Sequence, residues 1–278
     1  MSKLYVVGTP IGNLGDMTYR AVETLRSVDF IAAEDTRVTR KLLQHFEIKK
    51  PLLSYHEHNR KYVGDEIVKK ILSGETCAVV TDAGMPCISD PGEDLVKLCA
   101  ENGVPIEVVP GPSAVISALA VSGLDTSKFV FEGFPSTSPS SRNEALAAAA
   151  RETRTVIFYE APHKLVSTLS DLLRYFGDRR ISVCRELTKL HEEVIRTTLA
   201  EAVNLYDDDL RKPRGEYVLV VEGAKNIPEA EPTLEDALER VKELVKNGMR
   251  GADACREIAK TSGFSKSELY SALLAEKE

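Results

Sequence analysis

LYVVGTPIGNLG, residues 4–15, is the stretch that decides the fold class of this chain. Four apolar residues, enough for a short buried strand, run straight into a loop with glycines at positions 8, 12 and 15. Glycine lets backbone N–H groups come close to a ligand, and open α/β sheets bind ligands at the carboxyl ends of their strands. The spacing G-x3-G-x2-G is not the dinucleotide pattern G-x-G-x-x-G, and no G-x4-G-K-[ST] occurs. A P-loop is therefore excluded and a nicotinamide site is disfavoured.

Short apolar runs separated by helical patterns continue to about residue 222. Strands that alternate with helices predict an α/β chain with mostly parallel sheets. A break at residues 123–127 divides the runs, because two sheets of four or five strands fit the length better than one. The expected strands are 4–7, 30–33, 52–55, 77–81 and 106–109 in the first set, and 129–132, 156–159, 181–184, 193–197 and 217–221 in the second.

The composition changes after Gly223. A short polar stretch with two prolines predicts a linker. A longer helical pattern follows, and then two shorter ones joined by a turn at Gly263, which is the outline of a helix-turn-helix. Six basic residues against four acidic ones between 242 and 270 leave open whether this tail contacts nucleic acid or serves packing or dimerisation. The expected domains are 1–122 and 123–224, both α/β, then a linker at 225–232 and a small helical domain at 233–278.

Composition narrows the class of protein. The chain has 278 residues, 43% hydrophobic and 28% charged, and no apolar run approaches the roughly 20 residues of a membrane span. The apolar run before Gly8 is also too short for a signal peptide, so we expect a cytoplasmic protein without membrane association. Five cysteines without a C-x-x-C pair argue against a disulfide framework and a zinc ribbon, and favour small core residues.

Charge is unevenly distributed. The formal net charge of −7 argues against a broad coat of nucleic acid. Between Arg37 and Lys61, however, seven basic residues stand against two acidic ones. Such a run is either a solvated helix face with its loop or a patch that faces the substrate, and the sequence leaves both interpretations open.

Two more loops follow expected strands as the first one does. Residues 82–92 contain two glycines, two prolines and two aspartates, more than a simple connector needs. Residues 109–114, VPGPSA, open a helix whose first N–H groups, with the Ser113 hydroxyl, can bind a polar ligand group. Three such loops at one sheet edge predict a ligand crevice.

These loops and four further motifs closely resemble one known family. The further motifs are AEDTR at 33–37, FYEAPHK at 158–164, CRELTK at 184–189 and RGE at 214–216. In order and over the whole chain, the sequence resembles the ribosomal RNA small-subunit methyltransferase I family, the cytidine 2′-O-methyltransferases of the tetrapyrrole methylase superfamily. The resemblance implies two α/β domains that hold S-adenosylmethionine in a cleft between them, usually as a homodimer. It also implies methyl transfer to the ribose 2′-hydroxyl of a cytidine in 16S ribosomal RNA of the small subunit.

Carried over position by position, the resemblance implies cofactor contacts from both domains. They are Pro10, Ile11, Asp82, Met85, Ile88, Ser113, Ala114, Tyr159, Leu187, Gly215 and Glu216. One departure is visible, because many members of the superfamily have Gly-Asp-Pro in the second loop and this chain has Gly84-Met85-Pro86. The polar contacts to the cofactor at this point are therefore not specified.

Methyl transfer from a sulfonium needs no metal, and the chain has no H-E-x-x-H or His-x3-His pattern. It needs a hydroxyl held in line with the methyl group and a group that orients or deprotonates it. Glu34 and Asp35 follow an expected strand at the same sheet edge, so either is a candidate, with Arg37 contacting RNA. The same residues also fit an N-cap and ion pair that start the next helix. Contacts to RNA are expected from Arg37, Arg40, Lys41, His58, Lys164 and Arg185.

Two other functions fit part of the pattern. A methylase of the same superfamily that acts on a tetrapyrrole or another small acceptor would share the crevice, but it has no evident use for the basic run or the helical tail. A ligand-sensing helix-turn-helix regulator without enzymatic activity would need a clearly basic tail.

Overall fold

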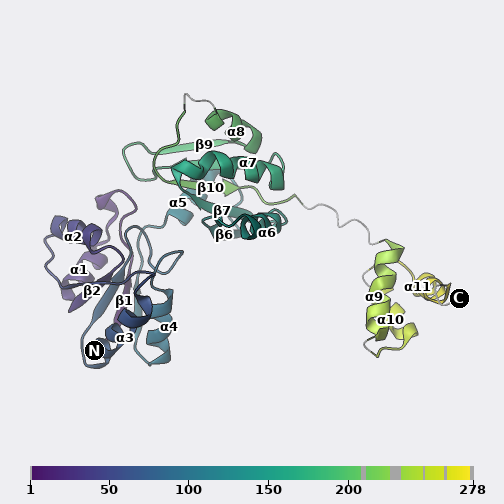
Figure 1. The fold of residues 1–278 in the computed structure, drawn as a ribbon, viewed down its shortest axis with the longest axis horizontal. Coiled ribbons are helices and arrows are strands. Elements are labelled where there is room, and N and C mark those ends of the chain that lie inside the picture. Colours follow the sequence, from purple (N-terminus) through teal and green to yellow (C-terminus); the bar gives the residue numbers. More distant parts are fainter. Residues whose placement is uncertain (1, 208–210, 226–232, 247, 260–261, 276–278) are drawn as a thin grey trace. The chain divides into compact units, whose positions relative to one another are not determined.

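The computed structural model describes residues 2–207, 211–225, 233–246, 248–259 and 262–275 (Figure 1). The chain forms two compact units, Met1–Gly223 and Ala224–Glu278. The first unit holds two five-stranded sheets, and the described part of the second is helical. The predicted α/β class with a helical carboxyl-terminal part is thus confirmed. The predicted linker lies, apart from its first residue, outside the described residues.

The first sheet has the strand order β3-β2-β4-β1-β5, and all its described pairings are parallel. Its central strands are continuous apolar runs, which suits a parallel sheet covered by helices on both faces. Helices α1 and α2 pack on one face, and α3 and α4 pack on the other. These elements are β1 (Leu4–Val7), α1 (Tyr19–Ser27), β2 (Phe30–Ala33), α2 (Thr36–His45), β3 (Leu52–Ser54), α3 (Arg60–Leu72), β4 (Cys77–Val80), α4 (Glu93–Glu101) and β5 (Ile106–Val109).

The strand order brings the loops after β1, β4 and β5 together, because β1 lies between the other two. Hydrogen bonds join these loops directly. Thr9 and Gly84 exchange N–H···O bonds of 2.9 and 3.1 Å, and the Gly8 N–H donates to the Val109 carbonyl at 3.0 Å. A Cβ on Gly8 would lie only 2.7 Å from the Cα of Gly111, so the two backbones meet where no side chain fits.

The second sheet has the order β6-β7-β10-β8-β9. Among its described strands only β6 and β7 pair in parallel, whereas β10 is antiparallel to β7 and β8, and β8 to β9. The expectation of mostly parallel sheets is therefore wrong for this half. The short connection from β8 to β9 contains no helix, and a parallel pair would need a crossover. The strands are β6 (Phe129–Gly133), β7 (Thr155–Glu160), β8 (Arg180–Arg185), β9 (Glu193–Thr198) and β10 (Tyr217–Val221).

Helices cover both faces of this sheet, and one of them links the two halves. On one face α6, α7 and α8 enclose the largest apolar cluster. On the other face α5, which follows β5 of the first sheet, packs against Val218 and Val220, together with Ile11 of the first loop. The predicted boundary between residues 122 and 123 falls at the carboxyl end of α5. These helices are α5 (Ala114–Ser122), α6 (Pro139–Ala149), α7 (Leu165–Phe176) and α8 (Leu199–Asp207), with single 3-10 turns at Leu14–Asp16 and Pro162–Lys164.

The second unit contains α9 (Leu234–Lys246), α10 (Gly251–Ala259) and α11 (Lys266–Ala275) around one small core. Thr233 and Asp236 form a reciprocal cap, with N–H···O bonds of 3.1 and 3.2 Å. Ser265 and Glu268 repeat this arrangement at the start of α11. In the described part of the chain, no helix combines the length and the apolar character that crossing a membrane requires.

Candidate functional site

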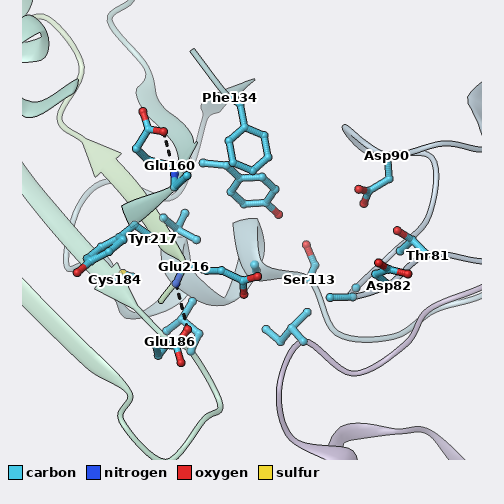
Figure 2. Close-up of a pocket in the computed structure, with 18 of the residues that line it drawn as sticks. Thr81, Asp82, Asp90, Ser113, Phe134, Glu160, Cys184, Glu186, Glu216 and Tyr217 are labelled. Atoms are coloured by element: carbon cyan, nitrogen blue, oxygen red, sulfur yellow. Dashed lines mark hydrogen bonds between the residues drawn. The ribbon is translucent and has the colours of Figure 1, made fainter. Parts of the chain in front are cut away.

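A cavity of about 570 Å³ lies within the first unit, where the loop edge of the first sheet meets the second sheet. The lining residues come from the loops after β1, β2, β4, β5 and β6 and from the ends of β7, β8 and β10. In Figure 2, Thr81, Asp82 and Asp90 gather on one side, and Phe134 and Glu186 come from the other. A cavity of this size is typical of a small-molecule site.

The acidic wall of the cavity consists of Glu34, Thr81, Asp82 and Asp90. The Glu34 carboxylate accepts the Thr81 hydroxyl at 2.5 Å and the backbone N–H of Asp82 at 3.3 Å. Asp82 in turn accepts the backbone N–H of Asp35 at 3.1 Å, so the loops after β2 and β4 are bonded to each other. Burial, together with the charge of Glu34, raises the pKa of Asp82. The crowded carboxyl groups favour a ligand that carries positive charge.

Asp90 lies on a loop with an unusual backbone. Its neighbours Cys87 and Ser89 have φ angles of 71° and 58°, in the left-handed region that few residues other than glycine adopt. Gly92 makes room for this turn, because a Cβ there would lie 2.7 Å from the Cys87 sulfur. Burial, and then the charge of Glu34, raises the pKa of Asp90 to about 6. Strained backbone of this kind gathers at functional sites.

The aromatic wall consists of Phe134 and Tyr159, which face the cavity from the second sheet. The Tyr159 ring lies edge-on to Phe131 at 4.8 Å between centroids and tilted to Phe134 at 5.4 Å. Phe134 is 60% exposed although it is large and apolar. Burial raises the pKa of Tyr159 to about 12, so its hydroxyl stays protonated at neutral pH. The wall offers an aromatic surface to a flat ligand group.

Lys189 holds together the part of the cavity that lies nearest the first loop. Its Nζ pairs with Glu186 at 2.8 Å and with Glu216 at 2.9 Å. The first loop packs on this cluster, because a Cβ on Gly12 would collide with the Lys189 side chain. Gly215, with φ of 77°, leaves the space that the Glu186 side chain fills. Both glycines are thus required by close packing.

Glu160 is a buried carboxylate at the end of β7, and it lines the cavity. One of its oxygens accepts the backbone N–H of Ala161 at 2.8 Å, and the other accepts the hydroxyl of Thr168 on α7. Arg142 of α6 donates to the Thr168 oxygen at 2.9 Å and to Asp171 at 2.8 Å. This network fixes the end of β7 to the two helices behind it.

Replacing Thr168 with valine should lower the free energy of unfolding by about 1–3 kcal/mol, because the buried Glu160 oxygen loses its donor while the shape is kept. Urea unfolding at neutral pH measures the change. Ser170→Ala, which removes an exposed hydroxyl from the same helix, is the control and should stay within about 0.5 kcal/mol of the natural sequence. Equal unfolding free energies for the two variants would contradict the role assigned to this network.

Comparison with known proteins places the chain in a family. A family model of the tetrapyrrole (corrin/porphyrin) methylases matches residues 3–203. A ribosomal RNA small subunit methyltransferase I from Synechocystis sp. is 47% identical over 273 residues, which are 97% of this chain and 96% of that protein. The chain belongs to the ribosomal RNA small subunit methyltransferase I family. The resemblance found in the sequence is therefore confirmed.

Proteins of the methyltransferase I family differ in length. The Bacillus subtilis relative is 44% identical over 276 residues, 98% of this chain and 94% of that protein. The Thermotoga maritima relative is 49% identical over 223 residues, which are 80% of this chain but 99% of that protein. A protein of that length has room for a unit such as Met1–Gly223 and for little else.

Solved structures share the fold at low sequence identity. A diphthine synthase matches with a TM-score of 0.59 and 14% identity, over 79% of this chain and 89% of that chain. A uroporphyrin-III C-methyltransferase from Thermus thermophilus, complexed with S-adenyl homocysteine, matches with a TM-score of 0.56 and 19% identity. The match covers 79% of this chain and 97% of that chain. The fold of this chain is thus shared with both of these proteins.

The cavity gathers nine of the eleven residues for which the family resemblance implied cofactor contact. Pro10 and Gly215 are not among the lining residues, and Gly215 instead leaves space for Glu186. Contact with the cofactor stays a prediction for all eleven. The nine that line the cavity are Ile11, Asp82, Met85, Ile88, Ser113, Ala114, Tyr159, Leu187 and Glu216.

Of the three residues predicted for catalysis in this methyltransferase I chain, Glu34 lines the cavity, and Asp35 and Arg37 do not. Asp35 is the N-cap of α2, where its carboxylate accepts the Arg37 N–H at 2.8 Å and pairs with the Arg37 guanidinium at 2.7 Å. Hydrogen bonds from Arg37 lower the pKa of Asp35 to about 2, which makes it a weak base. The structure has the cap and ion pair that the sequence offered as the alternative.

The residues predicted to bind RNA lie outside the cavity lining. Arg185 pairs with Glu193 at 3.6 Å, Lys164 is partly buried, and Lys41 and His58 are exposed. Arg40 lines a second depression, which we call the basic groove because it also holds Lys49 and Lys50. The basic groove is lined by Arg40, Leu43, Gln44, Glu47, Ile48, Lys49, Lys50 and Leu52.

Sequence reasoning did not single out Thr81, Asp90 or Phe134 as site residues. Asp90 carried a signal, because its loop was already notable for its glycines, prolines and aspartates. The sequence gives no such signal for Phe134, since an aromatic residue after a strand is ordinarily part of a core. Its exposure of 60% is visible only in the fold.

Proposed function

We propose that this chain transfers the methyl group of S-adenosylmethionine to the ribose 2′-hydroxyl of a cytidine in 16S ribosomal RNA of the small subunit. The observation that carries the proposal is the cavity, which combines an acidic wall, an aromatic wall and apolar side chains in about 570 Å³. Membership of a family whose relatives bear the name ribosomal RNA small subunit methyltransferase I supports the choice of acceptor.

The cavity residues suit this donor, which carries positive charge at its sulfonium and ammonium groups, an aromatic adenine and a carboxylate. Glu34 and Asp82 supply the opposite charge. Ser113 begins α5 without making a capping hydrogen bond, so its hydroxyl and the first N–H groups of the helix suit a carboxylate. Apolar surface for the adenosine comes from Ile11, Met85, Ile88, Ala114, Leu187 and Val218.

When bound, the donor supplies an electrophilic methyl group. The work left to the chain is to hold the ribose hydroxyl in line with that group and to keep water away, which accounts for much of the rate enhancement in such transfers. The apolar side chains that line the cavity help to exclude water. The Tyr159 hydroxyl, protonated at neutral pH, can donate a hydrogen bond but cannot remove the proton. The carboxyl groups crowded on the acidic wall, Glu34, Asp82 and Asp90, are the groups of the cavity best suited to accept that proton.

The basic groove supports an RNA acceptor over a small one. Helix α2 connects the groove to the site, because its cap Asp35 bonds to Asp82 and its later residues Arg40, Leu43 and Gln44 line the groove. Ten helical residues span about 15 Å, a distance that a few nucleotides of a single strand can cover. Phosphates in the groove would hold the neighbouring nucleotide at the cavity, whereas a tetrapyrrole would leave the groove unused.

The proposal is tested by incubating the purified protein with tritium-labelled S-adenosylmethionine and small ribosomal subunits. Label should appear in the RNA, and mass mapping should find it on a cytidine ribose. Label in a corrinoid precursor but not in the particles would instead support a small-acceptor methylase. A shift of duplex DNA without cofactor would support a regulator. If calorimetry detected no uptake of the donor, with or without particles, the proposal would be wrong.

We also infer that the chain acts as a homodimer in the cytoplasm, where small subunits are assembled. Support for a dimer comes from apolar side chains left exposed on the edge strand β5 and on α5, among them Val108 and Ile116, which are 55% and 52% exposed. Exposed apolar patches of this kind mark interaction sites. Light scattering should give twice the chain mass, and Val108→Glu should lower it to that of one chain.

A protein that ends at Gly223 should bind S-adenosylmethionine with the same affinity as the full chain. The cavity is lined entirely by residues of the first unit, and the Thermotoga maritima relative has little beyond that length. Calorimetric titration of both proteins checks this. A loss of affinity of tenfold or more in the shortened protein, about 1.4 kcal/mol, would mean that the second unit completes the donor site.

A further inference from the structure

We propose that Asp90 is the catalytic group that takes the proton of the ribose hydroxyl. It lines the cavity beside Glu34 and Asp82, across from Phe134, on a loop that also touches the second sheet (Figure 2). The inference rests on the proposed function and adds to it the residue that acts as the base.

The carboxyl groups that line the cavity from the second half are already engaged. Glu160 is buried and accepts two hydrogen bonds from its own surroundings. Glu186 and Glu216 both pair with Lys189, which offsets part of their charge and keeps them near the first loop. A carboxylate held by a cation is a poor proton acceptor. Among the carboxyl groups that line the cavity, those of the acidic wall are thus the ones left to act as the base.

Within the acidic wall, Glu34 and Asp82 form hydrogen bonds that join the loops after β2 and β4. Glu34 accepts the Thr81 hydroxyl and the Asp82 N–H, and Asp82 accepts the N–H of Asp35. Both thereby hold the ends of β2 and β4 in place. In the described part of the chain, Asp90 forms no ion pair, and the group that hydrogen-bonds to its carboxyl is the Thr81 side chain, which also bonds to Glu34. Its carboxyl group is available to a ligand.

The surroundings of Asp90 make it a better base than an ordinary aspartate. Glu34 and Asp82 face it from the acidic wall, Cys87 from its own loop and Tyr159 from the second sheet, and none of these carries positive charge. The Thr81 side chain opposes the effect only in part, and the pKa of Asp90 stands at about 6. A carboxylate with this pKa is mostly ionised at neutral pH and still accepts a proton readily.

The loop that carries Asp90 is fixed at both of its ends. On one side Cys87 fits against Gly92, where no side chain could be added. On the other, Ser89 approaches the second sheet at Gly133, since a Cβ there would lie 3.0 Å from the Ser89 hydroxyl oxygen. A base must be held to within a fraction of an ångström of its target, and left-handed backbone on both sides of Ile88 supplies that rigidity.

The step balances without any further reactant. The 2′-oxygen forms its bond to the methyl carbon as the carbon–sulfur bond breaks, and the electron pair of the broken bond stays on sulfur. The hydroxyl proton moves to the Asp90 carboxylate and leaves to solvent after product release. The positive charge of the donor is thereby replaced by one released proton, so no oxidant, reductant or metal takes part.

The test compares Asp90→Asn, Asp90→Glu and Asp94→Asn in single turnovers with saturating donor and small ribosomal subunits. Asp94 is the matched control, because it is an exposed acid close by in sequence that pairs with Arg60 outside the cavity. Asp90→Asn should keep its affinity for the donor and lose about 10²-fold or more in rate. Asp90→Glu should recover part of the rate, and Asp94→Asn should match the natural sequence.

The pH dependence gives a readout that needs no variant. Asp90 acts when deprotonated, so the single-turnover rate of the natural sequence should fall as pH drops below about 6 and level off above it. A rate that does not change between pH 5 and pH 8 would overturn the proposal. So would an Asp90→Asn protein with the natural rate, or one whose only defect is weaker donor binding. If the natural protein methylates no small-subunit RNA at all, the proposed function fails, and the role of Asp90 fails with it.

Discussion

Gly8→Ala protein is expected to bind S-adenosylmethionine about 10- to 100-fold more weakly than the natural sequence and to unfold more easily by about 1–3 kcal/mol. The added carbon would lie 2.7 Å from both the Cα of Gly111 and the sulfur of Met85. Since Gly111 is backbone, the conflict is relieved only by moving the first and third loops apart. Those loops carry Ile11 and Ser113, so the donor site opens with them. Calorimetric titration and urea unfolding measure the two effects.

Gly64→Ala is the control for this substitution, because it adds the same atom to the same unit. Gly64 lies inside α3, and a Cβ there would make an ordinary contact of 3.4 Å with Leu98. Alanine in a helix interior should raise stability by about 0.5–1 kcal/mol. Donor binding should stay unchanged. If Gly8→Ala behaved like Gly64→Ala, the close approach of the two loops would not matter for the site.

Reversing the charge of the basic groove should weaken binding to small-subunit RNA by about 10²-fold at physiological salt, because three phosphate contacts are lost. The variant replaces Arg40, Lys49 and Lys50 with glutamate. The slope of log affinity against log salt concentration should become shallower by about 2, because each phosphate contact on a single strand contributes about 0.7 to that slope and three contacts are lost. Affinity for S-adenosylmethionine should not change, since none of the three residues lines the cavity. Filter binding over a range of salt concentrations provides both numbers.

The matched control reverses three other exposed lysines of the first unit, Lys69, Lys97 and Lys128, which lie outside the groove. This variant has the same change in net charge. It should keep most of its affinity for RNA. Equal losses in the two variants would show that binding depends on overall charge, and the basic groove would have no special role.

The central strands of the first sheet were predictable because each is a continuous apolar run. Residues 4–7 and 30–33 have the predicted bounds, since burial on both faces leaves a plain signal in the sequence. The edge strand at 106–109 also has its predicted bounds, although Ile106 and Val108 are exposed. The direction of pairing was not predictable in the second sheet. Strand β10 lies between β7 and β8 although it comes from a distant part of the chain. No local sequence pattern encodes which strands it pairs with or whether the pairing is parallel or antiparallel.

The candidate site was predictable in its loops and not in its details. The glycines at 8 and 12 of the first loop were noted in the sequence, and the fold packs both closely, Gly8 against the backbone of Gly111 and Gly12 against the Lys189 side chain. The role of Asp35 could not be decided from the sequence, because aspartate is common both as a helix cap and as a catalytic residue. Asp90 owes its basicity to burial and to the charge of Glu34, which lies 56 positions earlier. Such proximity between distant positions arises only on folding.

Helix α5 begins in a loop bonded to the first sheet and packs on the second. The two cores are therefore joined at Pro112 and Ser113, immediately before the helix. A small rotation of the backbone at this junction would swing one sheet relative to the other, as at a hinge, and the contacts that cross between them, such as that of Ile11 with the cluster on α5, would have to shift. Ser113 would travel with the second sheet and Asp82 with the first. A rotation at this one joint would therefore change the width of the cavity that these two residues line.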